Sequence, residues 1–155
     1  MYEVFLFIHG NLRWVVLVLA VLAVVKYYMG WMSKKPFSPM DKRISMFYTA
    51  SLDTQLLIGL ILYIFLSPVT KMAFSNMGGA MKSPVLRFWA VEHITMMVLV
   101  VIVAHVGSVV SRKAKTDTDK YKKGFIYFAI SLVLILMAIP WPFREALGKG
   151  WFTGM

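Results

Sequence analysis

The chain contains no cysteine and few charged residues, and both features exclude several classes of protein. Without cysteine, the chain cannot form disulfides, iron–sulfur clusters, thiolate metal sites or a covalent c-type haem attachment. Only 15% of its 155 residues are charged and 59% are hydrophobic, whereas about a quarter of the residues of a soluble domain are charged. The composition is therefore that of an integral membrane protein.

The hydrophobic residues fall into four blocks, each near the roughly 20 residues that a helix needs to cross a bilayer. The predicted spans cover residues 4–32, 44–66, 85–110 and 124–143. These blocks are too long for barrel strands, and an isolated segment in lipid must satisfy its backbone hydrogen bonds internally, which requires a helix. We therefore predict one all-α domain over residues 1–155, a four-helix transmembrane bundle with up-down-up-down topology.

The positions of the basic residues predict the orientation of this bundle. Lys and Arg number 17 against 7 Asp and Glu, giving a net charge of +10. Ten of them lie in the first and third connections, and five lie in the second connection, the start of the third span and the C-terminal tail. The excess predicts cytoplasmic first and third connections, with both termini periplasmic, in a bacterial inner (cytoplasmic) membrane. The pattern also fits contact with anionic lipid head groups and argues against nucleic-acid binding.

All three histidines lie inside predicted spans, where ionisable groups are costly and are therefore candidates for function. His9 follows Glu3 by six residues and His93 follows Arg87 by six, so each lies roughly 9 Å below a charged residue at the outer interface. The first and third spans run in the same direction, which brings both imidazoles to the same depth. Two neutral ring nitrogens facing each other in a bundle suit bis-histidine ligation of a haem b near the periplasmic face.

Two charged residues are predicted to support this site. Arg13 lies one turn from His9 on nearly the same helix face, where it could meet a haem propionate or pair with Glu92 at similar depth. Glu92 or Asn11 could instead orient a histidine ring. The same residues could also form another metal site or a quinone site, or a purely structural hydrogen-bond network that holds the helices in register.

A second polar cluster, formed by His105, Asp53 and Lys26, is expected nearer the cytoplasm. His105 is not on the face of His93, because twelve residues turn a helix through about 120° beyond whole turns. It could bond Asp53 or form one side of a quinone or proton site. We favour the alternative, in which Asp53 pairs with Lys26 or His105 to satisfy a buried charge.

Four segments, "HGNLRW", "LDTQLLIGLILY", "RFWAVEHITMM" and "AIPWPF", resemble a group of small bacterial four-span membrane proteins often labelled simply "cytochrome B". Those proteins share H-S-x-x-R-[WY], D/H-x-Q-L-L-x-G-L-x-L-Y, E-H-x-x-M-x and I-P-W-P-[FW] in successive spans. The resemblance covers all four spans and implies a haem b electron carrier. The family's recurrent positions correspond here to His9, Arg13, Asp53, Gln55, Glu92 and His93. His105 falls on no family motif, and Gly10 stands where serine is usual.

We therefore predict a membrane-embedded haem b electron-transfer protein or subunit. The sequence contains no H-E-x-x-H, Gly-rich phosphate loop or G-x-S-x-G, so a carrier or accessory subunit is favoured over a stand-alone enzyme. Because little of the chain lies outside the bilayer, we expect a larger membrane complex or an oligomer, with a quinone or a periplasmic cytochrome as redox partner. The alternative is a cofactor-free accessory subunit of a larger respiratory or other membrane complex.

Overall fold

A computed structural model describes residues 1–152, apart from the side chain of Glu145, and every regular element in that part of the chain is helical. Four helical segments are long and apolar enough to cross a membrane: Tyr2–Met32, Pro39–Leu66, Pro84–Lys113 and Asp117–Ala138. The prediction of an all-α chain with four helices able to span a membrane is confirmed at this level.

The four segments are built from seven of the elements, and the short helices α3 and α4 join the second segment to the third. In chain order the elements are α1 (Tyr2–Met32), α2 (Pro39–Ile61), the π-helix η1 (Leu62–Leu66), α3 (Pro68–Ser75), α4 (Met77–Ala80), α5 (Pro84–Arg87), the π-helix η2 (Phe88–Glu92), α6 (His93–Lys113), α7 (Asp117–Ala138) and the 3₁₀ helix η3 (Glu145–Leu147).

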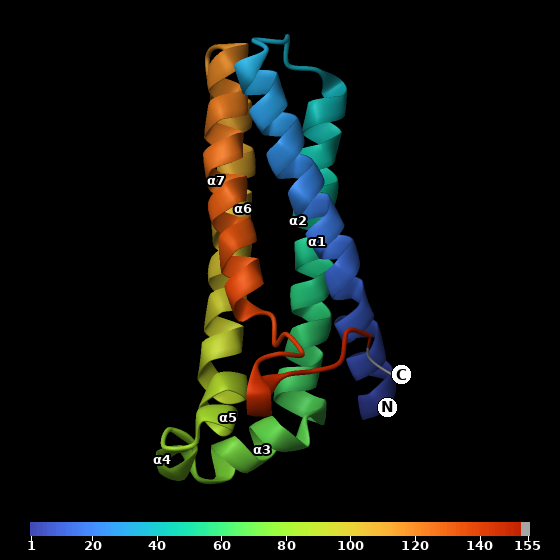
Figure 1. Cartoon of the computed structure of the whole chain (residues 1–155), viewed down its shortest axis with the longest axis vertical. Coiled ribbons are helices and arrows are strands. Elements are labelled where there is room, and N and C mark those ends of the chain that lie inside the picture. The colour runs from blue at the N-terminus through green and yellow to red at the C-terminus, as the bar shows by residue number, and fades with distance from the viewer. Residues whose placement is uncertain (153–155) are drawn as a thin grey trace.

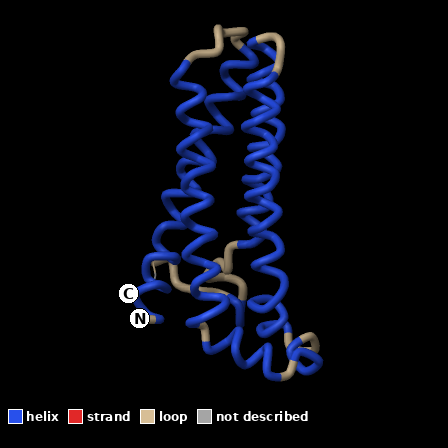
Figure 2. The backbone as a smooth tube through the Cα atoms, turned by 180° about the vertical axis from the view of Figure 1, so that it is seen from behind, coloured by secondary structure: helices blue, strands red, loops and turns tan. Residues whose placement is uncertain are grey.

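Figure 1 shows how these elements divide the bundle into two ends. One end holds the start of α1, helices α3 to α5 and residues 139–152, and we call it the terminal end. The other holds the α1–α2 and α6–α7 connections, and we call it the loop end. From behind, the tube of Figure 2 shows long helices in two groups along the whole height, with the loops gathered at the two ends.

Local sequence explains where the helices start and stop. Ser38 forms a capping box with Asp41 at the start of α2, and Thr116 accepts a hydrogen bond from the backbone N–H of Asp119 at the start of α7. The fourth span therefore begins at residue 117, where the sequence predicted 124. It ends at 138, where 143 was predicted, because Pro140 and Pro142 cannot continue a helix.

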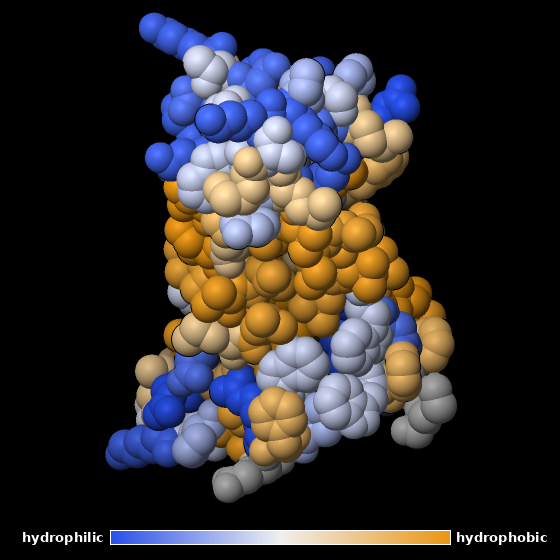
Figure 3. Space-filling view, turned by 45° about the horizontal axis from the view of Figure 1, so that its top comes forward, coloured by the Kyte–Doolittle hydropathy of each residue, from blue (hydrophilic) through white to orange (hydrophobic). Residues whose placement is uncertain are grey.

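The outer surface agrees with a membrane location. Figure 3 shows a hydrophobic band across the middle of the visible face, with hydrophilic residues above it and mixed residues below it. Large apolar side chains are exposed along all four long helices, for example Val18, Leu57, Ile102 and Val133. In a soluble protein such a band would be an aggregation hazard, whereas in a bilayer it contacts lipid tails.

The core of the loop end is closely packed and rich in tyrosine. Tyr27, Tyr48, Tyr121 and Phe128 are almost fully buried. The ring of Tyr27 meets those of Phe128 and Tyr121 edge-to-face, with centroids 5.0 and 5.7 Å apart. Gly124 allows this approach, because a Cβ at that position would lie 2.2 Å from the Tyr27 ring. The core therefore ties α1, α2 and α7 together near the loops.

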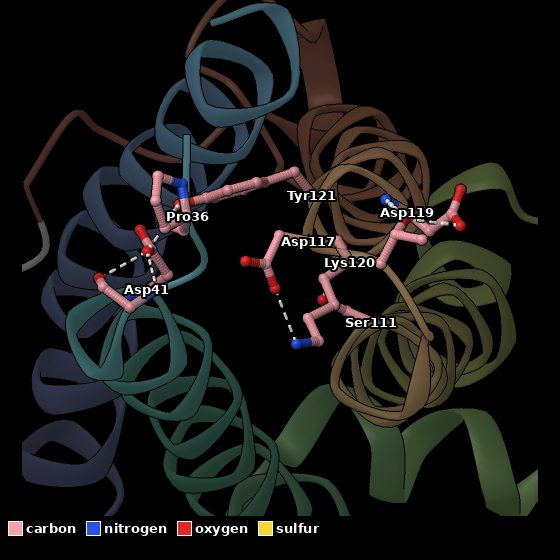
Figure 4. Close-up of polar contacts among 9 residues, drawn as sticks. Pro36, Asp41, Ser111, Asp117, Asp119, Lys120 and Tyr121 are labelled. Carbon is pink, nitrogen blue, oxygen red and sulfur yellow. Dashed lines mark hydrogen bonds and ion pairs between the residues drawn. The ribbon is translucent and has the colours of Figure 1, made fainter. Parts of the chain in front are cut away.

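The buried hydroxyls of this core are paired. The Tyr121 hydroxyl donates to Asp41 Oδ2 at 2.7 Å, and it also lies 3.2 Å from the Pro36 carbonyl oxygen, as Figure 4 shows from the loop end. The Tyr48 and Ser131 hydroxyls share a bond of 2.7 Å. Bonded hydroxyls between helices add to the packing that holds a membrane bundle together.

Candidate functional site

His9 and His93 lie side by side in the half of the bundle nearer the terminal end. Their ring centroids are 6.4 Å apart, and the ring planes meet at 74°. His9 comes from α1, roughly 10 Å along the helix from its first residue, and His93 is the first residue of α6. The two imidazoles that the sequence predicts at matching depth therefore do meet inside the bundle.

The ring of His93 is held by a backbone carbonyl and by aromatic neighbours. Its Nδ1 lies 3.0 Å from the carbonyl oxygen of Ala138, the last residue of α7. Because a carbonyl only accepts, we assign the proton to Nδ1, which leaves the lone pair of Nε2 for a ligand. The rings of Phe88 and Trp89 lie 5.7 and 5.6 Å from the imidazole. Both belong to η2, and π-helical turns are frequent at functional sites.

The ring of His9 rests against the backbone of α2. A Cβ at Gly59 would lie 2.9 Å from His9 Cε1, so the absence of a side chain there makes room for the imidazole. Gln55, one turn earlier, donates from Nε2 to the His9 carbonyl oxygen at 2.9 Å. Two atoms of this group, His9 Nδ1 and Gln55 Oε1, are buried without a hydrogen-bond partner among the described residues.

Two adjoining cavities share the two histidines in their walls. One has a volume of about 120 Å³ and lies toward α2, α3 and α6, and the other has about 260 Å³ and reaches toward α7 and the C-terminal segment. The larger cavity approaches the lower limit of the range typical of ligand pockets, roughly 300–1,000 Å³. The residues common to both walls are Leu6, His9, Leu52, Gln55, Trp89, His93, Met97 and Lys149. The site is therefore mostly apolar, with a few polar groups.

Arg13 holds the C-terminal segment over the larger cavity. Its guanidinium donates to the carbonyl oxygen of Gly150 at 2.7 Å, and the neighbouring Trp14 donates from Nε1 to the carbonyl oxygen of Trp151 at 2.9 Å. Gly150 and Phe152 from this segment line the cavity together with Arg13 itself. Two cationic side chains, Arg13 and Lys149, thus stand in its wall.

Glu92 does not join the histidines as predicted. Its carboxylate accepts from Arg87 Nε at 2.6 Å, and it lines neither cavity. The reason is local, because the π-helical turn η2 places residues 87 and 92 close enough to pair. The predicted Arg13–Glu92 pair is thus replaced by separate partners for each residue. Asn11, the other predicted support, donates to the carbonyl oxygen of Phe7 in its own helix.

The second predicted cluster divides into two separate ion pairs. His105 Nε2 lies 2.8 Å from Asp53 Oδ1, as one of the predicted pairings requires. Lys26 instead lies 3.7 Å from Asp41 Oδ1. The expectation of a buried charge is wrong for Asp53, because its side chain is 52% exposed and that of His105 is 45% exposed.

Sequence reasoning did not predict several contacts that shape the site. The carbonyl of Ala138 and the returning C-terminal segment were not foreseen. The only signal was the Pro-Trp-Pro motif, which predicts a helix end but not the path of the chain beyond it.

The described residues contain no group of three or more His, Asp or Glu side chains that could together hold a metal ion. Any metal at this site would therefore depend on the two histidines and on ligands that the chain does not supply. Comparisons with protein-family models, with curated proteins and with solved structures found no match to this chain.

Proposed function

We propose that this chain is a membrane-embedded haem b electron-transfer protein in which His9 and His93 would hold the haem iron. The observation that carries the proposal is the spacing of 6.4 Å between the ring centroids. An imidazole nitrogen lies about 2.0–2.1 Å from a bound metal and about 1.1 Å from its own ring centre, so two imidazoles on opposite sides of one ion have centres about 6.3 Å apart.

The surroundings of the two rings fit a flat and largely apolar ligand. Nε2 of His93 is available because Nδ1 is engaged by Ala138, and a hydrogen bond of this kind orients a ligating imidazole. Apolar walls on both sides of the rings limit access of water. A haem bound here would supply a one-electron iron couple, with bis-histidine ligation suited to electron transfer.

The remaining residues of the site take distinct roles in this proposal. Arg13 and Lys149, in the cavity wall, offer positive charge to the propionate carboxylates of a haem. Gly59 leaves space for the His9 ring, and Gln55 anchors the His9 backbone. Glu92 neutralises Arg87 and has no direct part in binding.

The same proposal includes the membrane setting. We infer an up-down-up-down bundle in a bacterial inner membrane with both termini periplasmic, because basic residues concentrate in the two connections at the loop end. The haem then lies near the periplasmic face. Because little of the chain lies outside the bilayer, we expect it to work within a larger membrane complex or an oligomer. Its redox partner would be a quinone or a periplasmic cytochrome. The basic loops would contact anionic lipid head groups.

An absorbance spectrum tests the haem directly. The protein purified from cells supplied with haem should show, after dithionite reduction, the α-band of a low-spin b haem. His9→Ala and His93→Ala should each abolish this band, since each removes one axial ligand. His105→Ala is the matched control, because His105 lines neither cavity, and it should leave the band unchanged.

Two outcomes would overturn the proposal. A stable, correctly folded preparation that stays colourless in the presence of haem would favour the alternative of a cofactor-free accessory subunit. Retention of the full band in both His9→Ala and His93→Ala would place a bound haem elsewhere. Circular dichroism of each variant in the same detergent separates loss of haem from loss of fold.

A further inference from the structure

A second polar site lies on the outer surface, where α2 and α6 meet. His105 on α6 and Asp53 on α2 are joined by the bond of 2.8 Å, and about half of each side chain is exposed. Asp53 stands at the middle of its span, fourteen residues after Pro39 and thirteen before Leu66. An ionisable pair open to the hydrocarbon region is costly, and such groups usually serve a function.

The chemistry of the pair defines what it would bind. A carboxylate only accepts hydrogen bonds, so the proton between the two groups belongs to His105 Nε2. With a single ring proton on Nε2, Nδ1 of His105 and Oδ2 of Asp53 remain as acceptors. Neither atom has a hydrogen-bond partner within residues 1–152. The pair therefore presents two acceptors and no donor, which complements a ligand that carries hydroxyl hydrogens.

The outer surface beside this pair is apolar. Leu57 lies one helical turn after Asp53, and Ile102 lies nearly one turn before His105, and both side chains are exposed. Neither residue of the pair lines the smaller cavity. A ligand at the pair would thus find apolar side chains for a flat ring beside its polar group. It would also have to arrive through the lipid.

We propose that Asp53 and His105 bind a hydroxyl group of a membrane-soluble hydroquinone, with its ring against the exposed apolar side chains of α2 and α6 and its apolar tail in the lipid. The phenolic hydrogen is donated to His105 Nδ1 or Asp53 Oδ2. Binding itself does not require a haem. Only a transfer of electrons from the hydroquinone to a haem held by His9 and His93 would rest on the proposed function.

Photolabelling in lipid nanodiscs tests the site. The whole protein is exposed to an azido derivative of decylhydroquinone, and labelled peptides are identified by mass spectrometry. Label should appear on α2 and α6 near Asp53 and His105, and decylhydroquinone should displace it. The dimethyl ether of decylhydroquinone lacks both hydroxyl hydrogens, so it should compete at least about tenfold less well, as expected for loss of a hydrogen bond to a charged group.

Variants test the two residues separately. Asp53→Asn and His105→Gln should each raise the concentration for half-maximal labelling by about tenfold or more. Thr54→Val is the matched control, since Thr54 is also exposed on α2 and its hydroxyl bonds only its own helix, at the Ala50 carbonyl. The control should label like the original protein.

Several results would overturn the inference. These are equal competition by the dimethyl ether, unchanged labelling in both variants, or native mass spectrometry showing a dimer that buries Asp53 and His105 between two copies. The two proposals are distinguished on the original protein. Specific labelling without a haem spectrum defeats the haem proposal alone, and a haem spectrum without specific labelling defeats the hydroquinone site alone. His9→Ala should lose the haem spectrum and keep specific labelling.

Discussion

The two ends of the bundle use the same four long helices but differ in how well their interiors are filled. At the loop end, Tyr27, Tyr48 and Tyr121 are buried against other rings, and their hydroxyls are hydrogen-bonded. Toward the terminal end, two cavities remain between the helices. Within residues 1–152, four buried side-chain atoms have no hydrogen-bond partner, and three of them belong to His9, Arg13 and Gln55, which line these cavities.

Helix geometry follows the same division. Both π-helices, η1 and η2, lie in the terminal half, next to the cavities that Leu62 and Trp89 line. π-Helical turns are rare overall and are frequent at functional sites. A buried polar atom without a hydrogen-bond partner lowers the stability of the fold. The comparison indicates that the loop end holds the bundle together and that the terminal end keeps space and unpaired atoms for a ligand. Three substitutions test this division, beginning with the largest expected effect.

Gly124→Ala should destabilise the protein by about 3 kcal/mol, near the upper range for an overpacked core. The new Cβ would lie 2.2 Å from the Tyr27 ring, which has packed neighbours and no free space to enter. The measurement is thermal or denaturant unfolding in detergent. Gly78→Ala is the control, because a Cβ there would meet only Asn76, at 3.9 Å, and it should change stability by less than about 0.5 kcal/mol. Equal stability of the two variants would show that the loop end is not closely packed.

Tyr121→Phe should cost about 2 kcal/mol, because it removes a hydrogen bond to a buried carboxylate. Asp41 would lose the donor at 2.7 Å and keep Ser38 and the more distant Lys26. Unfolding in detergent again gives the value. Tyr28→Phe removes an exposed hydroxyl near the same end and should have almost no effect. A loss below about 0.5 kcal/mol for Tyr121→Phe would mean that the bond contributes nothing to the loop end.

The sequence allowed the architecture to be predicted, because the signals for membrane helices are length and composition. It also placed His9 and His93 at one depth, since the rise per residue of a helix is constant. Rotation about the helix axes was harder to predict. Arg13 and Glu92 have suitable depth, but Glu92 turns to Arg87 through a π-helical turn that no residue pattern announces.

The sequence predicted the binding partners of the polar residues less well than the depth of these residues in the bundle. Asp53 was expected to satisfy a buried charge, yet it lies on the outer surface with His105. Lys26 could reach several acidic residues, and it pairs with Asp41, which a capping box fixes at the start of α2. Which partner a polar side chain binds depends on how the helices pack against one another. The C-terminal segment that Arg13 holds is likewise determined by tertiary contacts.

Gly59→Ala should have the smallest effect on stability and a specific effect on the site. Its Cβ would meet His9 Cε1 at 2.9 Å, so the ring must shift, but the ring borders a cavity and has space to move. Alanine also gains about 1 kcal/mol of helix propensity over glycine, which offsets the contact. We expect unchanged unfolding within about 1 kcal/mol, a shifted imidazole NMR signal for His9 and an unchanged signal for His105. If the proposed haem is bound, its α-band should weaken in the same variant. Destabilisation as large as that of Gly124→Ala would show that the terminal end is as tightly packed as the loop end, and the distinction between a stabilising end and a binding end would fail.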